Sequence, residues 1–131
     1  MKLLGALVCL FLTFQIGQVS NADAPMLPIS QTDMARLFGL QVSLVDEHNV
    51  MDLWFYKDGT VDAQVGVKNG PVCAPIFTWS LSKDGVLTSA DDKGNVQFKW
   101  SAIGFVPDGI CVQSARKVER YIIVKRQAKS N

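Results

Sequence analysis

Few residues in this sequence of 131 residues could support catalysis or bind a metal. His48 is the only histidine, and it lies in the polar segment 46–49, which is typical of a solvated turn. A hydrolase triad needs a histidine base beside a nucleophile. A metal site would have only Asp46 and Glu47 as further nearby ligands, too few to fix an ion. We therefore interpret His48 as a turn residue.

Two acidic candidates also favour structural roles. Segment 91–95, Asp-Asp-Lys-Gly-Asn, resembles part of a calcium loop but lacks the alternating oxygen ligands and final glutamate of an EF-hand. Glu119 has Arg116, Lys117 and Arg120 as sequence neighbours, which favours a surface ion pair. The sequence therefore predicts no catalytic residues, no metal site and no cofactor, and we expect the protein not to be an enzyme.

The first 22 residues have the layout of a secretory signal peptide. Lys2 is followed by a nearly continuous apolar run at 3–16 and then by the small residues Ser20 and Ala22. The run is shorter than the roughly 20 residues that span a bilayer. The sequence thus predicts cleavage after Ala22, a single domain at 23–131, no transmembrane anchor after processing, and a secreted or periplasmic location.

Cleavage would discard Cys9 and leave Cys73 and Cys111. In an oxidising compartment, two cysteines in a small domain favour a disulfide. Such a bridge would contribute about 3 to 4 kcal/mol in the chain-entropy model. The sequence therefore predicts a Cys73–Cys111 disulfide, with two free thiols as the alternative.

The charge distribution is uneven, although 13 Lys and Arg nearly balance 12 Asp and Glu. The near-zero net charge argues against a nucleic-acid-binding protein. Segment 116–131, however, carries six basic residues against one glutamate. It is either a surface for an anionic partner or a charged edge that keeps the last strand soluble. The candidate basic patch is Arg116, Lys117, Arg120, Lys125 and Arg126.

The residue pattern predicts one helix followed by strands. Segment 28–38 favours a helix that Ser30 caps, with Asp33 three residues later and Gly39 as the end signal. After Gly39 the apolar period changes from 3.6 to 2, and short turns separate about eight strands. The Asp58-Gly59 hairpin allows two registers, which pair Val61 with Tyr56 or, as we prefer, with Phe55.

These elements predict an all-β fold, an antiparallel up-and-down barrel of about eight strands with a short N-terminal helix. Short connections favour a meander, and barrel closure removes open sheet edges. A barrel of this size is either filled by side chains or holds one small ligand. Several aromatic residues would then form a ligand pocket or a packed core. They are Trp54, Tyr56, Phe77, Trp79, Phe98 and Trp100.

Two hairpins carry a resemblance to small secreted lipocalin-like barrels of the calycin type. They are Leu-Trp-Phe-Tyr-Lys-Asp-Gly-Thr at 53–60 and Trp-Ser-Leu-Ser-Lys-Asp-Gly-Val-Leu at 79–87. The resemblance covers about residues 30–126 and implies a binding protein for a small apolar or amphipathic ligand. The same fold hosts bacterial periplasmic inhibitors of proteases and lysozyme. The alternative is therefore an interaction protein with an extracytoplasmic protein partner, acting through loops or through segment 23–29.

Overall fold

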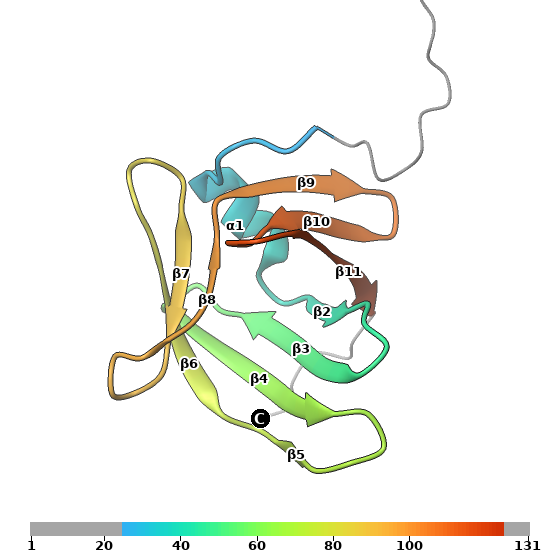
Figure 1. Cartoon of the computed structure of the whole chain (residues 1–131). Coiled ribbons are helices and arrows are strands. Elements are labelled where there is room, and N and C mark those ends of the chain that lie inside the picture. The colour runs from blue at the N-terminus through green and yellow to red at the C-terminus, as the bar shows by residue number, and fades with distance from the viewer. Residues whose placement is uncertain (1–24, 125–131) are drawn as a thin grey trace, which may run out of the picture.

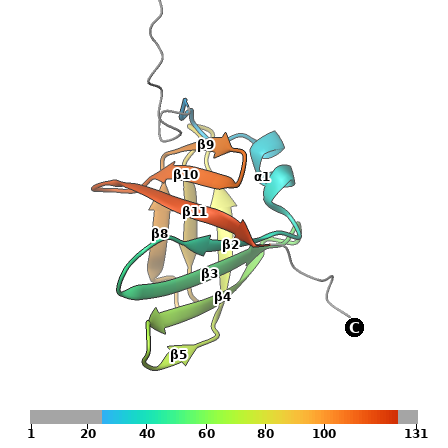
Figure 2. The same ribbon diagram turned by 90° about the vertical axis from the view of Figure 1, so that its right-hand side faces the viewer.

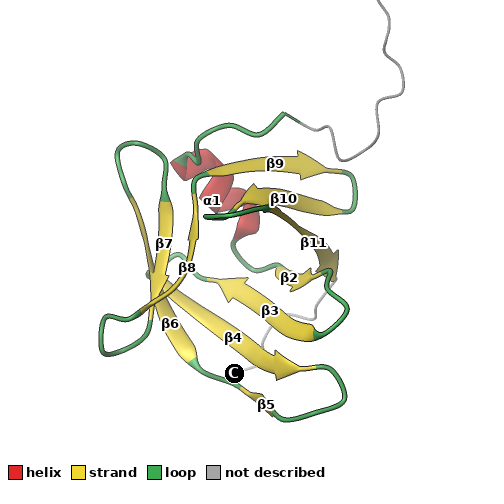
Figure 3. Cartoon of the chain, viewed as in Figure 1, coloured by secondary structure: helices red, strands yellow, loops and turns green. Residues whose placement is uncertain are grey.

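The computed structural model describes residues 25–124, which form one short helix and ten strands (Figure 3). The predicted signal peptide at 1–22 and the patch residues Lys125 and Arg126 lie outside this range. Within the range, no helix has the length and apolar character needed to cross a membrane.

The helix α1 (Gln31–Leu37) begins at the predicted cap. Ser30 Oγ accepts a hydrogen bond from the Asp33 backbone N–H at 3.1 Å, and the Asp33 carboxylate accepts one from the Ser30 N–H at 2.9 Å. Seven residues are too few for a helix that is stable alone in water. Burial of Met34 and Leu37 inside the barrel therefore holds α1 in place, which confirms the predicted helix.

The strands form one antiparallel sheet that curves around a shared interior (Figures 1 and 2). Consecutive strands pair with each other from β2 to β4 and from β6 to β8, and both β5 and β6 pair with β4. Strands β9, β10 and β11 also pair consecutively, and β11 pairs with β2. The bounds are β2 (Gln41–Leu44), β3 (Asn49–Phe55), β4 (Thr60–Val67), β5 (Val72–Cys73), β6 (Ile76–Leu81), β7 (Leu87–Ala90), β8 (Val96–Trp100), β9 (Ala102–Val106), β10 (Gly109–Gln113) and β11 (Val118–Val124).

The last strand returns to the first, as the sequence predicts. Tyr121 of β11 lies opposite Leu44 of β2, and Ile123 lies opposite Val42. The barrel is not fully closed, because its two outermost strands, β8 and β9, are connected through Ser101 but are not paired with each other. The predicted up-and-down meander barrel with a short helix is therefore confirmed.

The hairpin at Asp58-Gly59 has the preferred register, with Phe55 opposite Val61. Gly59 adopts a φ of +95°, a conformation that glycine accepts without strain. This register places Leu53, Phe55 and Val61 together in the interior, where each is fully buried. The strand count is higher than predicted because β5 has only two residues and β9 follows Trp100 with no turn sequence between them.

The predicted Cys73–Cys111 disulfide is wrong. Both cysteines are free, with Cys73 exposed in β5 and Cys111 buried in β10. Four strands, β4, β3, β2 and β11, separate β5 from β10 in the sheet. Only cysteines with Cα atoms within about 7 Å can form a bridge. The sequence argument rested on the number of cysteines and on the predicted compartment, and neither says whether two thiols lie close together in the fold.

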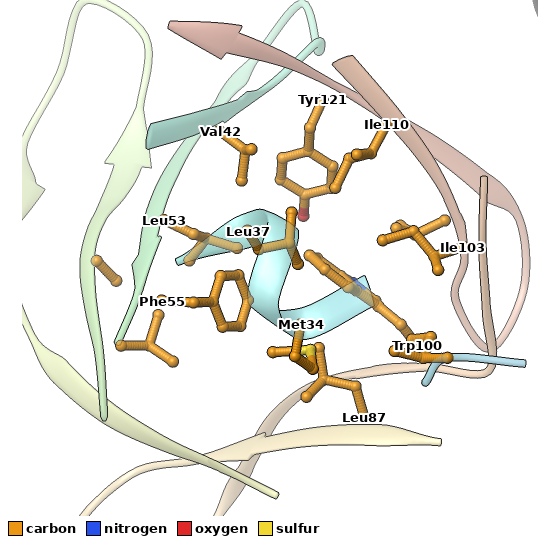
Figure 4. Packing of buried hydrophobic residues seen from close by; sticks show 14 of the residues in the cluster. Met34, Leu37, Val42, Leu53, Phe55, Leu87, Trp100, Ile103, Ile110 and Tyr121 are labelled. Carbon is orange, nitrogen blue, oxygen red and sulfur yellow. The ribbon is translucent and has the colours of Figure 1, made fainter. Parts of the chain in front are cut away.

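The core fills the half of the barrel that α1 covers (Figure 4). Met34 and Leu37 project from the helix toward Leu53, Phe55 and other inward side chains of the strands. The segment before the helix is fastened to the same half. Leu27 forms a bridge with Ile103 of β9, and the Ile29 N–H donates to the Gly85 carbonyl at 2.9 Å.

Candidate functional site

The barrel contains a solvent-open pocket of about 660 Å³ at the opposite end of β3 from α1. Phe38, which follows the helix, bridges to Phe55 at the last residue of β3, whereas the pocket begins at the first residue, Asn49. We call these two regions the helix end and the pocket end. The volume lies within the usual range of about 300 to 1,000 Å³ for small-molecule sites.

Five strands and one turn form the pocket. Residues from β2, β3, β4, β8 and β11 provide the walls, and the turn between β10 and β11 lies at the rim. The lining is mostly apolar on the inside and polar at the rim. It comprises Leu44, Asn49, Val50, Met51, Val65, Gly66, Val96, Gln97, Phe98, Lys99, Ser114, Ala115, Arg116, Lys117, Glu119 and Tyr121.

The inner wall of the pocket is one side of an aromatic cluster. Phe98 and Tyr121 line the pocket, and both contact the fully buried Trp100, with ring centroids 5.0 and 5.3 Å away. Phe55 completes the cluster at 5.8 Å from Trp100. Aromatic pairs at such distances add stabilisation beyond simple burial. The cluster therefore joins the packed core to the pocket.

Tyr121 is the most strongly perturbed group at this wall. Its hydroxyl donates to the Met51 sulfur at 3.5 Å. Burial raises the pKa of Tyr121 far above its usual value, and the negative charge of Glu119 raises that pKa further. Tyr121 thus stays neutral at physiological pH and offers an apolar ring and a polar hydroxyl to the pocket.

Three exposed cations lie at the rim, and one half-buried carboxylate lies nearer the interior. Lys99 comes from β8, Arg116 and Lys117 come from the β10–β11 turn, and Glu119 comes from β11. The turn is fixed because both the N–H and the hydroxyl of Ser114 donate to the Lys117 carbonyl, at 2.9 and 3.0 Å. The rim therefore has an excess of positive charge next to an apolar interior.

The structure separates the six aromatic residues that the sequence groups as a candidate pocket. Phe98 lines the large pocket, and Trp100 lies behind it in the core. Phe77 is buried, and Trp79 donates from Nε1 to the Tyr56 carbonyl at 2.8 Å. Burial or hydrogen bonding within the fold therefore accounts for Trp100, Phe77 and Trp79 without any ligand. The Tyr56 hydroxyl donates to Asp62 at 3.1 Å.

Trp54 belongs to a second and smaller hollow of about 320 Å³. Asp62 and Gln64 of β4 line it together with the chain between β5 and β6. These residues alternate with the buried Val61 and Ala63, so they face away from the interior. The six aromatic residues therefore do not share one cavity.

The candidate basic patch is divided as well. Arg116 and Lys117 lie at the pocket rim. Arg120 instead forms an ion pair with Asp108, in which Nη2 donates to both carboxylate oxygens, at 3.0 and 2.9 Å. Lys125 and Arg126 lie outside the described residues. Of the described members, only Arg116 and Lys117 thus contribute to the pocket.

The polar turns have the structural roles expected from the sequence. His48 and Glu47 are strongly exposed, with 3.9 Å between His48 Nε2 and Glu47 Oε1. Asp46 accepts hydrogen bonds from the backbone N–H groups of His48 and Asn49, and these bonds hold its pKa below the usual value. In the next such turn, Asp91 accepts from the N–H groups of Lys93 and Asn95 at 2.9 Å.

No cluster of three or more potential metal-ligating side chains occurs within residues 25–124. The segment proposed as an interaction arm, 23–29, is described from Pro25 onward and lies against the barrel. Leu27 exchanges backbone hydrogen bonds with Ile103 at 3.1 and 2.9 Å, and Ile29 is buried. This described part is therefore built into the fold.

Sequence reasoning missed most of the pocket walls. Met51 could have been found, because it precedes Leu53 by two residues and must share its face. Tyr121 and Glu119 could not have been found, because the last strand is apolar on both faces and its inward side is ambiguous.

Comparisons with family models, with curated proteins and with solved structures found no match to this chain. The fold and the pocket together define an all-β barrel with a solvent-open cavity of ligand size in its described part.

Proposed function

We propose that this chain is a non-enzymatic binding protein that holds a small, partly apolar ligand in the pocket end of the barrel. The observation that carries the proposal is the 660 Å³ cavity, whose inner wall is apolar and aromatic and whose rim is polar. A ligand there would cover Leu44, Met51, Val65, Phe98 and Tyr121. Removing such surface from water stabilises a complex by about 25 cal/mol per Å² before the costs of association.

The proposal keeps the lipocalin-like interpretation of the hairpins and the secreted or periplasmic location. The predicted signal peptide at 1–22 supports that location, and the barrel with its interior cavity is the architecture such binding proteins use. The inhibitor alternative relies on exposed loops or on the arm at 23–29. The attachment of Leu27 and Ile29 to the barrel gives the arm less freedom to reach a partner.

The test is binding of a neutral apolar fluorophore, N-phenylnaphthylamine, to the protein and to two matched variants. Val65 lies inside the pocket, so Val65→Trp fills it and should abolish the fluorescence increase. Val67 lies on the same face of β4 but is 45% exposed and does not line the pocket, so Val67→Trp should bind like the parent protein.

Circular dichroism establishes that each variant is folded, and Val65→Phe is a smaller replacement if Val65→Trp is not. The proposal fails if the parent protein does not bind the fluorophore. It also fails if both Trp variants bind it equally well, because the dye would then occupy another surface. In the first case, capture of a protein partner becomes the leading function.

A further inference from the structure

The pocket has a consistent polarity from its inner wall to its rim. Phe98, Tyr121 and Met51 form the apolar inner part, whereas Lys99 and the Arg116-Lys117 pair are exposed at the rim. The pair belongs to the β10–β11 turn, whereas Lys99 alternates with the inward-facing Phe98 and Trp100 of β8 and therefore borders the opening from the outer face of that strand. A ligand that enters the apolar part must pass them.

None of these three cations forms an ion pair within the described part of the chain, although the charge of Lys117 helps to lower the pKa of Asp46. Neither Lys99, Arg116 nor Lys117 has a carboxylate within 4.0 Å among residues 25–124. Arg120 of β11, by contrast, forms an ion pair, with 2.9 Å between its Nη2 and Asp108 Oδ2. Charges beside an apolar wall attract an opposite charge more strongly than charges in bulk water do.

Glu119 determines which way such a ligand lies. It points inward from β11, two residues from Tyr121 and on the same face, opposite Val112 of β10. A carboxylate at this position repels an anionic group that goes deeper into the pocket. Its charge therefore favours an orientation in which the anionic group stays at the rim with the cations.

We propose that the ligand is a single-chain amphiphile with an anionic head group, a carboxylate or a phosphate. Its apolar tail lies against Phe98, Tyr121 and Met51, and its head lies at the rim beside the Arg116-Lys117 pair. This inference rests on the proposed function, because it assigns a ligand class to the same pocket. The cations confer selectivity, and the apolar wall supplies most of the affinity.

The test compares three ligands of equal chain length by isothermal titration calorimetry below their micelle concentrations. They are dodecanoate, dodecanol and dodecyltrimethylammonium, and dodecyl phosphate is a fourth arm that separates the two anionic heads. We expect dodecanoate to bind about tenfold more tightly than dodecanol, the size of a charge-assisted contact at a partly exposed site. Added salt should weaken the binding of dodecanoate and leave that of dodecanol unchanged.

Three variants locate the effect. Arg116→Gln combined with Lys117→Gln should reduce dodecanoate affinity about tenfold, to the dodecanol level, without changing dodecanol binding. Glu119→Gln should tighten dodecanoate binding. Lys57→Gln combined with Lys83→Gln, which removes two charges from the β3–β4 and β6–β7 turns outside the pocket, is the control and should change neither affinity.

The outcomes separate this inference from the proposed function. Equal affinity for dodecanoate and dodecanol would overturn the anionic head group and leave the apolar pocket intact. Tightest binding of dodecyltrimethylammonium would overturn it in favour of a cationic ligand at Glu119. If none of the ligands binds, the proposed function itself fails.

Discussion

The two ends of β3 lie in regions that are packed in opposite ways. At the helix end, Leu53 and Phe55 are fully buried against Met34 and Leu37 of α1. At the pocket end, Asn49 and Met51 face a cavity of about 660 Å³. One strand thus serves both regions, and the difference lies in what covers them. A seven-residue helix fills one end, and no described element fills the other.

The helix and the N-terminal segment therefore contribute the packing that stabilises the fold, whereas the solvent-open cavity contributes little. Capping at Ser30, burial of Met34 and Leu37, and the bond from Ile29 to Gly85 all lie at the helix end. Packed interiors gain dispersion energy that a solvent-open cavity does not provide. We expect substitutions at the helix end to affect folding and substitutions at the pocket end to affect binding.

The largest effect should come from truncating matched leucines in the two regions. Leu37→Ala removes a fully buried side chain from the helix end and should cost about 3 kcal/mol of unfolding free energy. Leu44→Ala acts on a half-buried pocket wall, where a cavity already exists, and should cost about 1 kcal/mol. Urea unfolding measures both, and equal costs would remove the distinction between the ends.

A second test uses two glycines with positive φ. A side chain at Gly85, with φ +82°, would meet Pro28 Cβ at 2.5 Å, whereas one at Gly94, with φ +86°, would meet nothing within 4 Å. Gly85→Ala should therefore cost about 2 kcal/mol and Gly94→Ala about 1 kcal/mol, the backbone strain alone. Thermal unfolding of the two variants gives the comparison. A Gly94→Ala cost equal to that of Gly85→Ala would show that the close contact with Pro28 contributes nothing.

A third test uses alkaline pH. The pKa of Tyr121 is raised in the folded protein, so the unfolded chain releases this proton first, above the ordinary value of 10.0. Stability is therefore intact below pH 10 and falls above it, by up to about 1.4 kcal/mol per pH unit. We expect the phenolate absorbance of Tyr121 to appear together with loss of the circular dichroism signal. Tyr121→Phe should abolish this dependence.

A fourth and smaller effect separates the paired cation from the rim cations. Arg120→Gln breaks the ion pair with Asp108 and should cost less than about 1 kcal/mol, because both groups are partly exposed. Lys117→Gln removes no ion pair and should leave the unfolding free energy unchanged. If Lys117→Gln destabilises the protein as much as Arg120→Gln does, the rim cations have a structural role.

The smallest effect concerns the thiols. Because Cys73 is exposed and Cys111 is buried and free, a thiol reagent should modify Cys73 rapidly and Cys111 only on unfolding. Reductant should leave the unfolding transition unchanged. Peptide mapping of the labelled protein distinguishes the sites, and a Cys73–Cys111 peptide in the unreduced sample would contradict the structure.

Local patterns predicted the parts of the fold that depend on neighbouring residues. The Ser30-Asp33 cap, the Phe55–Val61 register of the hairpin and the alternation in β3 and β4 involve residues close in sequence, and each is confirmed. The cysteines were mispaired because proximity across a sheet depends on strand order, which local patterns do not encode. The pocket depends on which inward side chains leave space between distant strands, and alternation specifies only that they face inward.

The corner at Ser101 has a mechanical consequence. Every other junction in the barrel is a ladder of backbone hydrogen bonds, but β8 and β9 meet only through the covalent chain, and Leu27 covers part of the β9 edge. We call this unpaired junction the seam. The barrel can widen at the seam without breaking the backbone hydrogen bonds between paired strands. The seam borders the pocket along Val96–Lys99, so we expect amide hydrogen exchange to be fastest in β8 and to slow when the pocket is occupied.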